Sequence, residues 1–139
     1  SGDYTVILTA TDDKGKSKSI TQIINVTPPK ECLVRIETPM GNMLARLSDL
    51  TPQHQDNFVN LVEENFYDDL LFHRVMRGFM VQGGDPKSRG AGPDTRLGFG
   101  GPGYQVPAEI VGNLAHVKGA LAAARTPNPE KASSGSQFY

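Results

Sequence analysis

The sequence is short of the features that fix several protein classes. It contains a single cysteine, Cys32, so an internal disulfide and a cysteine-based metal cluster are both excluded. No apolar stretch approaches the roughly 20 residues of a membrane-spanning helix, so we expect no membrane insertion. The 14 basic and 15 acidic residues give a formal net charge of −1, without a run of like charge. We therefore expect neither nucleic acid nor an anionic membrane as a partner.

What remains is the composition of a globular protein. The chain has 139 residues, of which 37% are hydrophobic and 21% charged, enough for one real core. Its 15 glycines and 10 prolines predict long loops shaped by backbone requirements. The chain starts at Ser1 without a methionine and stops on two aromatic residues, Phe138 and Tyr139. Because termini are usually polar and loose, we expect an internal piece of a longer polypeptide.

The first part of the chain predicts a β-hairpin. Residues 4–11 and 19–26 alternate in the manner of half-buried strands, and residues 12–16 form a turn in which Gly15 suits a positive φ. An isolated two-stranded hairpin is marginal in water, so this one should join a larger sheet. The pattern that starts at Gly2 resembles the last two strands of PKD-type immunoglobulin-like domains. The alternative is a generic surface hairpin that packs on the following domain.

The proposed domain organisation follows from two consecutive prolines. Pro28 and Pro29 force extended geometry and cannot pair within a sheet. We therefore assign residues 1–27 to the C-terminal hairpin of a PKD/Ig-like β-sandwich, residues 28–31 to a linker, and residues 32–139 to a second domain.

The second domain is predicted to be mainly β. Residues 32–38 and 42–47 predict a hairpin. Thr51 and Pro52 predict a helix start, with the hydroxyl as N-cap, and the apolar stripe of this helix ends near Asn65.

The rest of the domain predicts loops and short strands. Residues 83–103 hold eight glycines, which predicts an extended surface loop, while residues 119–125 and 137–139 predict short strands. Strands with non-local connections predominate. The expected fold class is therefore an antiparallel β-barrel or sandwich with helical plugs.

The hairpin predicted around Gly78 has unusual polar residues. Arg74, the apolar pair Phe79-Met80 and Gln82 fall close together, where a plain core hairpin would alternate apolar and dispensable polar residues. Together they could line an apolar slot with one fixed cation and one amide beside it. Taken singly, the arginine and the glutamine could be surface residues of the sheet, and the pair could be plain core.

This region resembles the cyclophilin family of peptidyl-prolyl cis/trans isomerases. The resemblance is strongest from Phe72 to Pro86 and covers residues 30–139. Further stretches match in order at residues 63–68, 100–109, 119–125 and 133–139. It implies a cyclophilin-like β-barrel with helical plugs. This barrel should be incomplete here, because the family continues past the position of Tyr139 with further pocket walls and closing strands.

The resemblance also implies roles for single residues. Arg74 falls on the catalytic arginine, and Gln82 falls on its polar partner. The substrate-binding positions of the family, which form the proline pocket, a backbone groove and an amide with an aromatic wall, fall on Phe79, Met80, Ala124, Arg125, Gln137 and Tyr139. Arg125 stands where many eukaryotic members have asparagine, and Tyr139 replaces a frequent phenylalanine.

The chemistry implied by the resemblance needs no metal or cofactor. An X–Pro bond rotates slowly because amide resonance must be lost, at a barrier of roughly 18–20 kcal/mol. A catalyst must bind the twisted amide more tightly than either planar isomer. An apolar pocket for the proline ring and a donor to the prolyl nitrogen would suffice.

The leading hypothesis is thus a prolyl isomerase that assists folding, and its expected partners are proline-containing polypeptides. Cyclic-peptide inhibitors of the cyclosporin type are a further candidate ligand. The alternative is a non-catalytic module that binds proline-containing segments and is attached to an Ig-like surface domain. Because PKD-like neighbours usually belong to extracytoplasmic proteins, the expected location is the periplasm or cell surface of a bacterium.

Other constellations fail. The glycines at 98, 100 and 103 match a dinucleotide fingerprint, but Pro102 and the lack of a following helix exclude it. His54, His73 and His116 are too scattered along the sequence to suggest a metal site.

Overall fold

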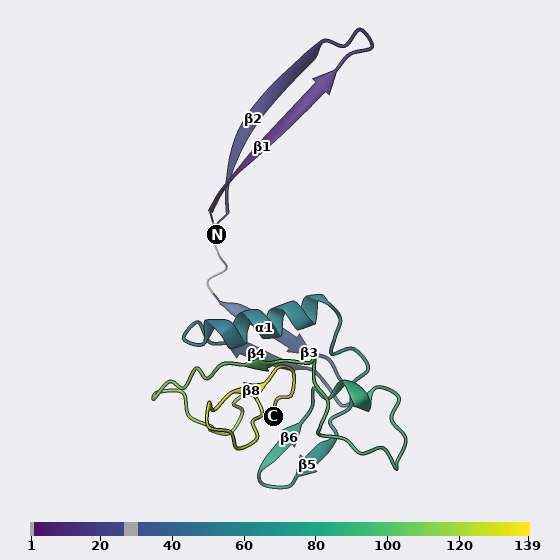
Figure 1. Ribbon diagram of the computed structural model, residues 1–139, viewed down its shortest axis with the longest axis vertical. Helices are drawn as coiled ribbons and strands as arrows, with labels where there is room; N and C mark the ends of the chain where they lie inside the picture. Colours follow the sequence, from purple (N-terminus) through teal and green to yellow (C-terminus); the bar gives the residue numbers. More distant parts are fainter. Residues whose placement is uncertain (1, 27–30) are drawn as a thin grey trace. The chain divides into compact units, whose positions relative to one another are not determined.

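The chain forms two compact units, Ser1–Cys32 and Leu33–Tyr139 (Figure 1). A computed structural model describes residues 2–26 and 31–139. Within these ranges there are eight β-strands, which pair into four two-stranded sheets. There are also one α-helix and one 3₁₀ helix. Apart from Glu31, the predicted linker at 28–31 lies outside the described residues. None of the helices in the described ranges is long and apolar enough to cross a membrane.

The first unit is the predicted hairpin, with strands longer than expected. Strands β1 (Gly2–Thr11) and β2 (Ser17–Val26) pair antiparallel, with Tyr4 opposite Ile24. The connecting turn has Gly15 at a φ of 78°, as predicted. The Asp12 carboxylate fixes this turn because its Oδ1 accepts the main-chain N–H groups of Lys14 and Lys16.

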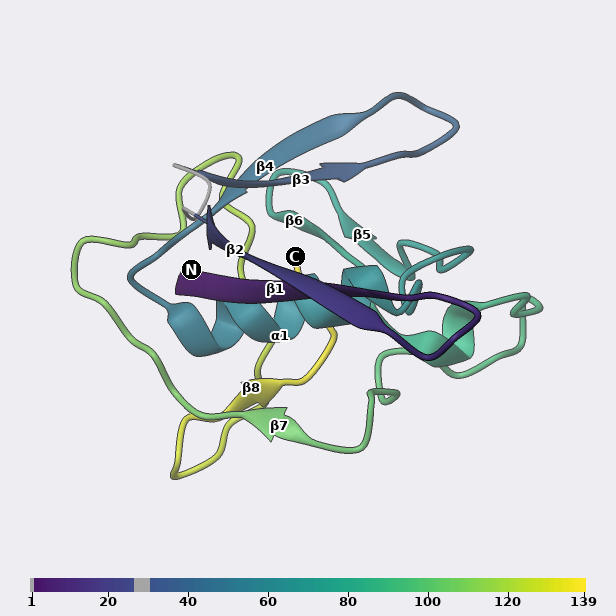
Figure 2. The same cartoon turned by 90° about the horizontal axis from the view of Figure 1, so that it is seen from above.

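The second unit is mainly β with one α-helix, and its strands are short. They are β3 (Cys32–Ile36), β4 (Met43–Leu47), β5 (Arg74–Met76), β6 (Met80–Gln82), β7 (Gln105–Val106) and β8 (Ser133–Ser134). Helix α1 (Pro52–Glu63) runs between the β3–β4 hairpin and the β7–β8 pair (Figure 2). Among the described residues, no sheet closes into a barrel.

Helix α1 starts where the sequence predicts, but its cap differs from the prediction. Pro52 occupies the first turn as expected, but a hydroxyl N-cap by Thr51 is wrong, since Thr51 Oγ1 donates to the carbonyl of Ser48 at 3.2 Å. The carboxylate of Glu109 caps the helix instead, accepting the main-chain N–H groups of Gln53 and His54 at 3.0 and 2.9 Å. The helix ends at Glu63, close to the predicted end.

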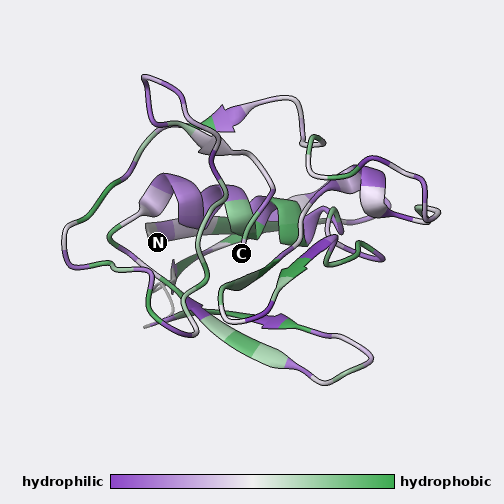
Figure 3. Ribbon diagram, turned by 90° about the horizontal axis from the view of Figure 1, so that it is seen from below, coloured by the Kyte–Doolittle hydropathy of each residue, from purple (hydrophilic) through white to green (hydrophobic). Residues whose placement is uncertain are grey.

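Aromatic side chains behind the apolar half of α1 form the core of this unit. The ring of Phe58 stacks on that of Tyr67, with centroids 4.9 Å apart, and Phe138 meets both rings edge-on. Leu61 is 3% exposed beside them. Figure 3 shows the apolar residues of α1 gathered in its C-terminal half. The Tyr67 hydroxyl donates to the carbonyl of Ser136, and burial, with Tyr104 nearby, raises the pKa of Tyr67.

The prediction of a surface loop over residues 83–103 is wrong for the first part of this segment, which is buried. Asp85 and Ser88 are fully buried, and a 3₁₀ helix, η1 (Pro86–Ser88), follows Asp85 directly. This part of the chain can be buried because its backbone packs closely at Gly84. Gly84 has a φ of 84°, and a side chain there would collide with the carbonyl of Ser136. The glycines therefore bring this backbone into the interior.

The strands predicted at 119–125 and 137–139 are reduced to single bridges. Ala123 pairs with Phe138, and Gly83 pairs with Phe138 from the other side. Main-chain hydrogen bonds join Ala122 to Tyr139 in both directions at 2.9 Å. These bridges are too short for strands, but they bring the C-terminal segment beside β6.

Candidate active site

The residues singled out from the sequence come together around one hollow of about 850 Å³. They come from the β5–β6 hairpin, including its turn, and from the segments near residues 124 and 137. All eight line it: Arg74, Phe79, Met80, Gln82, Ala124, Arg125, Gln137 and Tyr139.

The β5–β6 hairpin positions the cation. Arg74 and Gln82 are directly opposite each other in the strand register, and Gly78 makes the turn at a φ of 72°. Arg74 Nη1 donates to Gln82 Oε1 at 3.4 Å, and Nη2 contacts the Sδ of Met76 at 3.1 Å. Within the described ranges no carboxylate pairs with this guanidinium. The charge is thus held in place while remaining exposed to the hollow.

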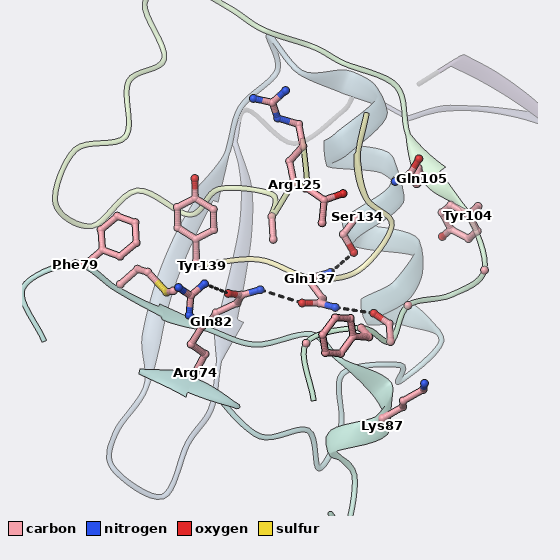
Figure 4. Close-up of a pocket in the computed structure, with 18 residues that line it drawn as sticks. Arg74, Phe79, Gln82, Lys87, Tyr104, Gln105, Arg125, Ser134, Gln137 and Tyr139 are labelled. Atoms are coloured by element: carbon pink, nitrogen blue, oxygen red, sulfur yellow. Dashed lines mark hydrogen bonds between the residues drawn. The ribbon is translucent and has the colours of Figure 1, made fainter. Parts of the chain in front are cut away.

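A row of hydrogen-bonded amides continues from the cation across the hollow (Figure 4). Gln82 Nε2 donates to Gln137 Oε1 at 2.9 Å, and Gln137 Nε2 donates to the carbonyl of Gly100 at 2.7 Å. Gln137 is 6% exposed, and its main-chain N–H donates to Ser134 Oγ at 3.0 Å. Because each amide has one direction fixed by its neighbour, the row holds the acceptor oxygen of Gln82 toward Arg74.

Sequence reasoning missed the group at the far end of this row. Asp85 is fully buried, and its Oδ2 accepts the N–H groups of Gly98, Phe99 and Gly100 at 2.6, 3.1 and 3.1 Å. Its Oδ1 accepts the N–H of Lys87 at 2.9 Å. Burial alone would raise the pKa of Asp85, but these N–H groups and nearby His73 outweigh it and leave the pKa below its ordinary value of 3.8. A buried anion therefore organises the loop that carries the Gly100 carbonyl.

Part of this role had a local signal. An aspartate followed by a proline predicts a turn in which the carboxylate accepts an N–H two residues on, as it does from Lys87. Nothing local in the sequence predicted its contacts with residues 98–100.

The other end of the hollow is apolar. Figure 4 shows the rings of Phe79 and Tyr139 on the same side of the view, and half-buried Met80, next to Phe79 in sequence, also lines the hollow. Adjacent strand residues should face opposite ways, yet Phe79 and Met80 both line the hollow. The reason is that Phe79 belongs to the turn before β6, where its N–H donates to the carbonyl of Met76 at 3.1 Å. Phe79 is 70% exposed.

The two residues of the predicted backbone groove, Ala124 and Arg125, differ in whether their main chain is already hydrogen-bonded. Ala124 uses its own main chain internally, donating to Gln137 and accepting from Ser134, both at 2.8 Å. In the part of the chain that the structure describes, the main chain of Arg125 makes no hydrogen bond. Arg125 is therefore the residue of the two whose backbone is open to a bound peptide.

The family follows from comparison with known proteins. A family model described as "Cyclophilin type peptidyl-prolyl cis-trans isomerase/CLD" matches residues 33–139. The chain belongs to the cyclophilin family. The mainly β fold with one α-helix is consistent with this membership.

Several bacterial proteins named peptidyl-prolyl cis-trans isomerase are similar to this chain. The chain is 40% identical over 105 residues to a peptidyl-prolyl cis-trans isomerase of Synechococcus elongatus, covering 75% of this chain and 64% of that protein. It is 44% identical over 84 residues to peptidyl-prolyl cis-trans isomerase B of Bacillus subtilis, covering 60% and 51%. A Helicobacter pylori isomerase is 36% identical over 113 residues, covering 79% and 62%. The chain thus spans about half to two thirds of the length of these relatives.

The histidines of this cyclophilin domain have separate surroundings. His54 Nδ1 is 2.7 Å from Glu109 Oε2, His116 Nδ1 is 3.1 Å from the Tyr139 hydroxyl, and His73 lies near Asp85. No group of three potential metal ligands occurs among the described residues.

Proposed function

We propose that this protein is a peptidyl-prolyl cis-trans isomerase that accelerates rotation about X–Pro bonds in protein substrates and so assists folding. One observation carries the proposal. A guanidinium without a carboxylate partner in the described ranges is fixed beside an apolar surface, with Arg74 held by Gln82 next to Phe79 and Met80.

In the proposed mechanism the proline ring lies at the apolar end of the hollow, against Phe79, Met80 and Tyr139. Arg74 donates a hydrogen bond to the prolyl nitrogen as the amide twists and its lone pair localises. A rise in rate from ~10⁻² to ~10³ s⁻¹ requires roughly 7 kcal/mol of stabilisation specific to the twisted amide. A charged donor that is already oriented can supply a large part of this, because it needs no reorganisation during the reaction.

The test is Arg74→Ala in the full-length protein, with Arg77→Ala as the matched control. Arg77 is exposed in the same hairpin and does not line the hollow. In an assay of proline-peptide isomerisation, we expect Arg74→Ala to lower kcat/KM by about 10²–10³-fold and Arg77→Ala to change it little. Equal rates for the two variants would refute the role of Arg74. Tight peptide binding by an unmutated protein without rate acceleration would instead support a non-catalytic binding module.

We further propose that the hairpin β1–β2 belongs to a PKD/Ig-like sandwich and that the protein is extracytoplasmic. The sandwich is supported by an apolar sheet face. Tyr4, Leu8 and Ile24 lie on the same side of the hairpin and are all exposed in this chain. We also propose that the cyclophilin domain forms a closed barrel in the full-length protein, and that cyclosporin-type cyclic peptides compete for the apolar end of the hollow.

A further inference from the structure

The charged side chains that line the hollow are positive, whereas the whole chain is slightly negative. Its lining includes three cations, Arg74, Lys87 and Arg125, and among the described residues no aspartate or glutamate lines it. The chain as a whole has a net charge of −1. Positive charge is therefore concentrated in the groove that the proposed function assigns to substrate.

Nearby acids do not neutralise these cations. Lys87 and Arg125 are exposed, and within the described ranges neither forms an ion pair. Asp85, two residues from Lys87, is buried and saturated by main-chain N–H groups. Glu130, the acid nearest to Arg125 in sequence, is not among the lining residues of the hollow. The three lining cations therefore outnumber the one buried carboxylate beside the hollow, and the net charge around the groove is positive.

The positive lining continues beyond Arg125. A second hollow of about 530 Å³ is lined by Arg125, Pro127, Asn128, Pro129 and Lys131. Since Arg125 lines both hollows, it stands where they meet. A peptide that extends from the first hollow into the second passes one cation at the junction and meets another beyond it.

Resting on the proposed function, we propose that the groove favours proline-containing segments with a glutamate or aspartate within two residues of the proline. Arg125 and Lys87 recognise that charge. The proline takes the apolar end, and Figure 4 shows Arg125 and Lys87 on opposite sides of the Gln82–Gln137 row. An extended peptide advances about 3.3–3.6 Å per residue, so a flanking side chain can reach either cation within a few positions.

The test compares peptides that differ only in charge. Isomerisation is measured for peptides that are neutral apart from one varied residue. That residue is glutamate, glutamine or lysine, and it is placed in turn at each of four positions: the two before the proline and the two after it. For at least one position we expect kcat/KM for the glutamate peptide to exceed that for the glutamine peptide by roughly two- to fivefold at about 0.01 M ionic strength. The lysine peptide should be the slowest. The preference should vanish at about 1 M salt, where the Debye length is only about 3 Å.

Variants identify which residue reads the charge. The ratio of glutamate to glutamine rates is measured within each variant, so a change in overall activity does not affect it. Arg125→Gln or Lys87→Gln should bring the ratio close to one at the position that the residue reads, and Arg125→Glu should favour the lysine peptide. Lys118→Gln, which removes an exposed lysine outside both hollows, should keep the wild-type ratio.

The outcomes separate the two proposals. If every peptide isomerises at its uncatalysed rate, the isomerase function itself fails. If neutral peptides are accelerated but glutamate and glutamine peptides react equally at all four positions, only the preference for acidic segments is overturned. An acidic preference that Lys118→Gln removes as fully as Arg125→Gln and Lys87→Gln would overturn the assignment to the groove.

Discussion

At the residue scale, Asp85 is the buried anion on which the far end of the amide row depends. Its carboxylate holds the N–H groups of residues 98–100, and the carbonyl of Gly100 in turn accepts from Gln137. A side chain at Gly100 would collide with this carboxylate, so the loop and the anion fit only with glycine there. Arg74 is thus positioned through Gln82, Gln137 and Asp85, of which Gln82 is half-buried and the other two are buried.

We predict that Asp85→Asn weakens both the fold and the catalysis. Its amide cannot accept four N–H groups as the carboxylate does, so the free energy of unfolding should fall by about 2–4 kcal/mol. At temperatures where the variant stays folded, kcat should fall by about tenfold with little change in KM, because Arg74 loses orientation rather than the substrate losing its apolar contacts. Denaturant unfolding and isomerisation kinetics measure the two effects.

The control for this prediction is Asp94→Asn, the same change at an exposed carboxylate in the same loop. It should leave both quantities within experimental scatter. A stability loss in Asp85→Asn with kcat and KM unchanged would make Asp85 purely structural.

The sequence indicated the polar residues that line the hollow, but not the buried groups that hold them in place. Arg74 and Gln82 could be paired from the hairpin alone, because residues on facing strands with a tight turn must meet. Gln137 could be placed beside them only through family resemblance. The Asp85 contacts depend on a glycine-rich loop returning to a turn 13 or more residues earlier, a long-range approach that no local pattern encodes.

At the element scale, the helix α1 depends on a residue far away in the sequence. Glu109 accepts two main-chain N–H groups at its first turn and also contacts His54 Nδ1 at 2.7 Å. The sequence placed the start of this helix correctly through Thr51 and Pro52, but it could not show which side chain would cap it. A local hydroxyl was available, and a distant carboxylate took its place because an anion also interacts favourably with the helix dipole.

We predict that Glu109→Gln destabilises the protein by about 1–2 kcal/mol at neutral pH. Burial alone would raise the pKa of Glu109, but hydrogen bonds from the His54 ring and from the N–H groups of Gln53 and His54 outweigh it and lower the pKa below its ordinary 4.5. The unfolded chain therefore binds the proton more readily, and this contribution to stability is lost as the pH falls through the folded pKa.

Urea unfolding between pH 7 and pH 3 measures this contribution. The difference in stability between the unmutated protein and Glu109→Gln should be largest near neutrality and shrink below about pH 4.5. Glu130→Gln, at an exposed glutamate, should produce no such pH-dependent difference. A difference that stays constant across the range would mean that the Glu109 charge does not stabilise α1.

At the scale of the whole molecule, much apolar surface is uncovered. Leu33 and Leu44 of the β3–β4 hairpin are 51% and 70% exposed, and Ile110 and Val117 are also exposed. The sequence pattern predicted the two strands of the β3–β4 hairpin correctly, but alternation says only which side should be covered and not what covers it. The relatives in which the same region occurs are longer than the part matched by this chain. The closed barrel thus remains a prediction.

The same argument gives a prediction for the hairpin. One face of β1–β2 carries large apolar side chains, all exposed: Tyr4, Val6, Leu8, Ile20 and Ile24. If this face packs on an Ig-like sandwich in the full-length protein, Leu8→Lys should lower the free energy of unfolding of that domain by about 2–3 kcal/mol. Thr5→Lys introduces the same charge in the same strand on the opposite face, where a change within about 0.5 kcal/mol is expected. In the 139-residue chain, where Leu8 is 67% exposed, both variants should be nearly neutral. Equal effects of the two substitutions in the full-length protein would show that the apolar face is not buried there, which would overturn the sandwich assignment.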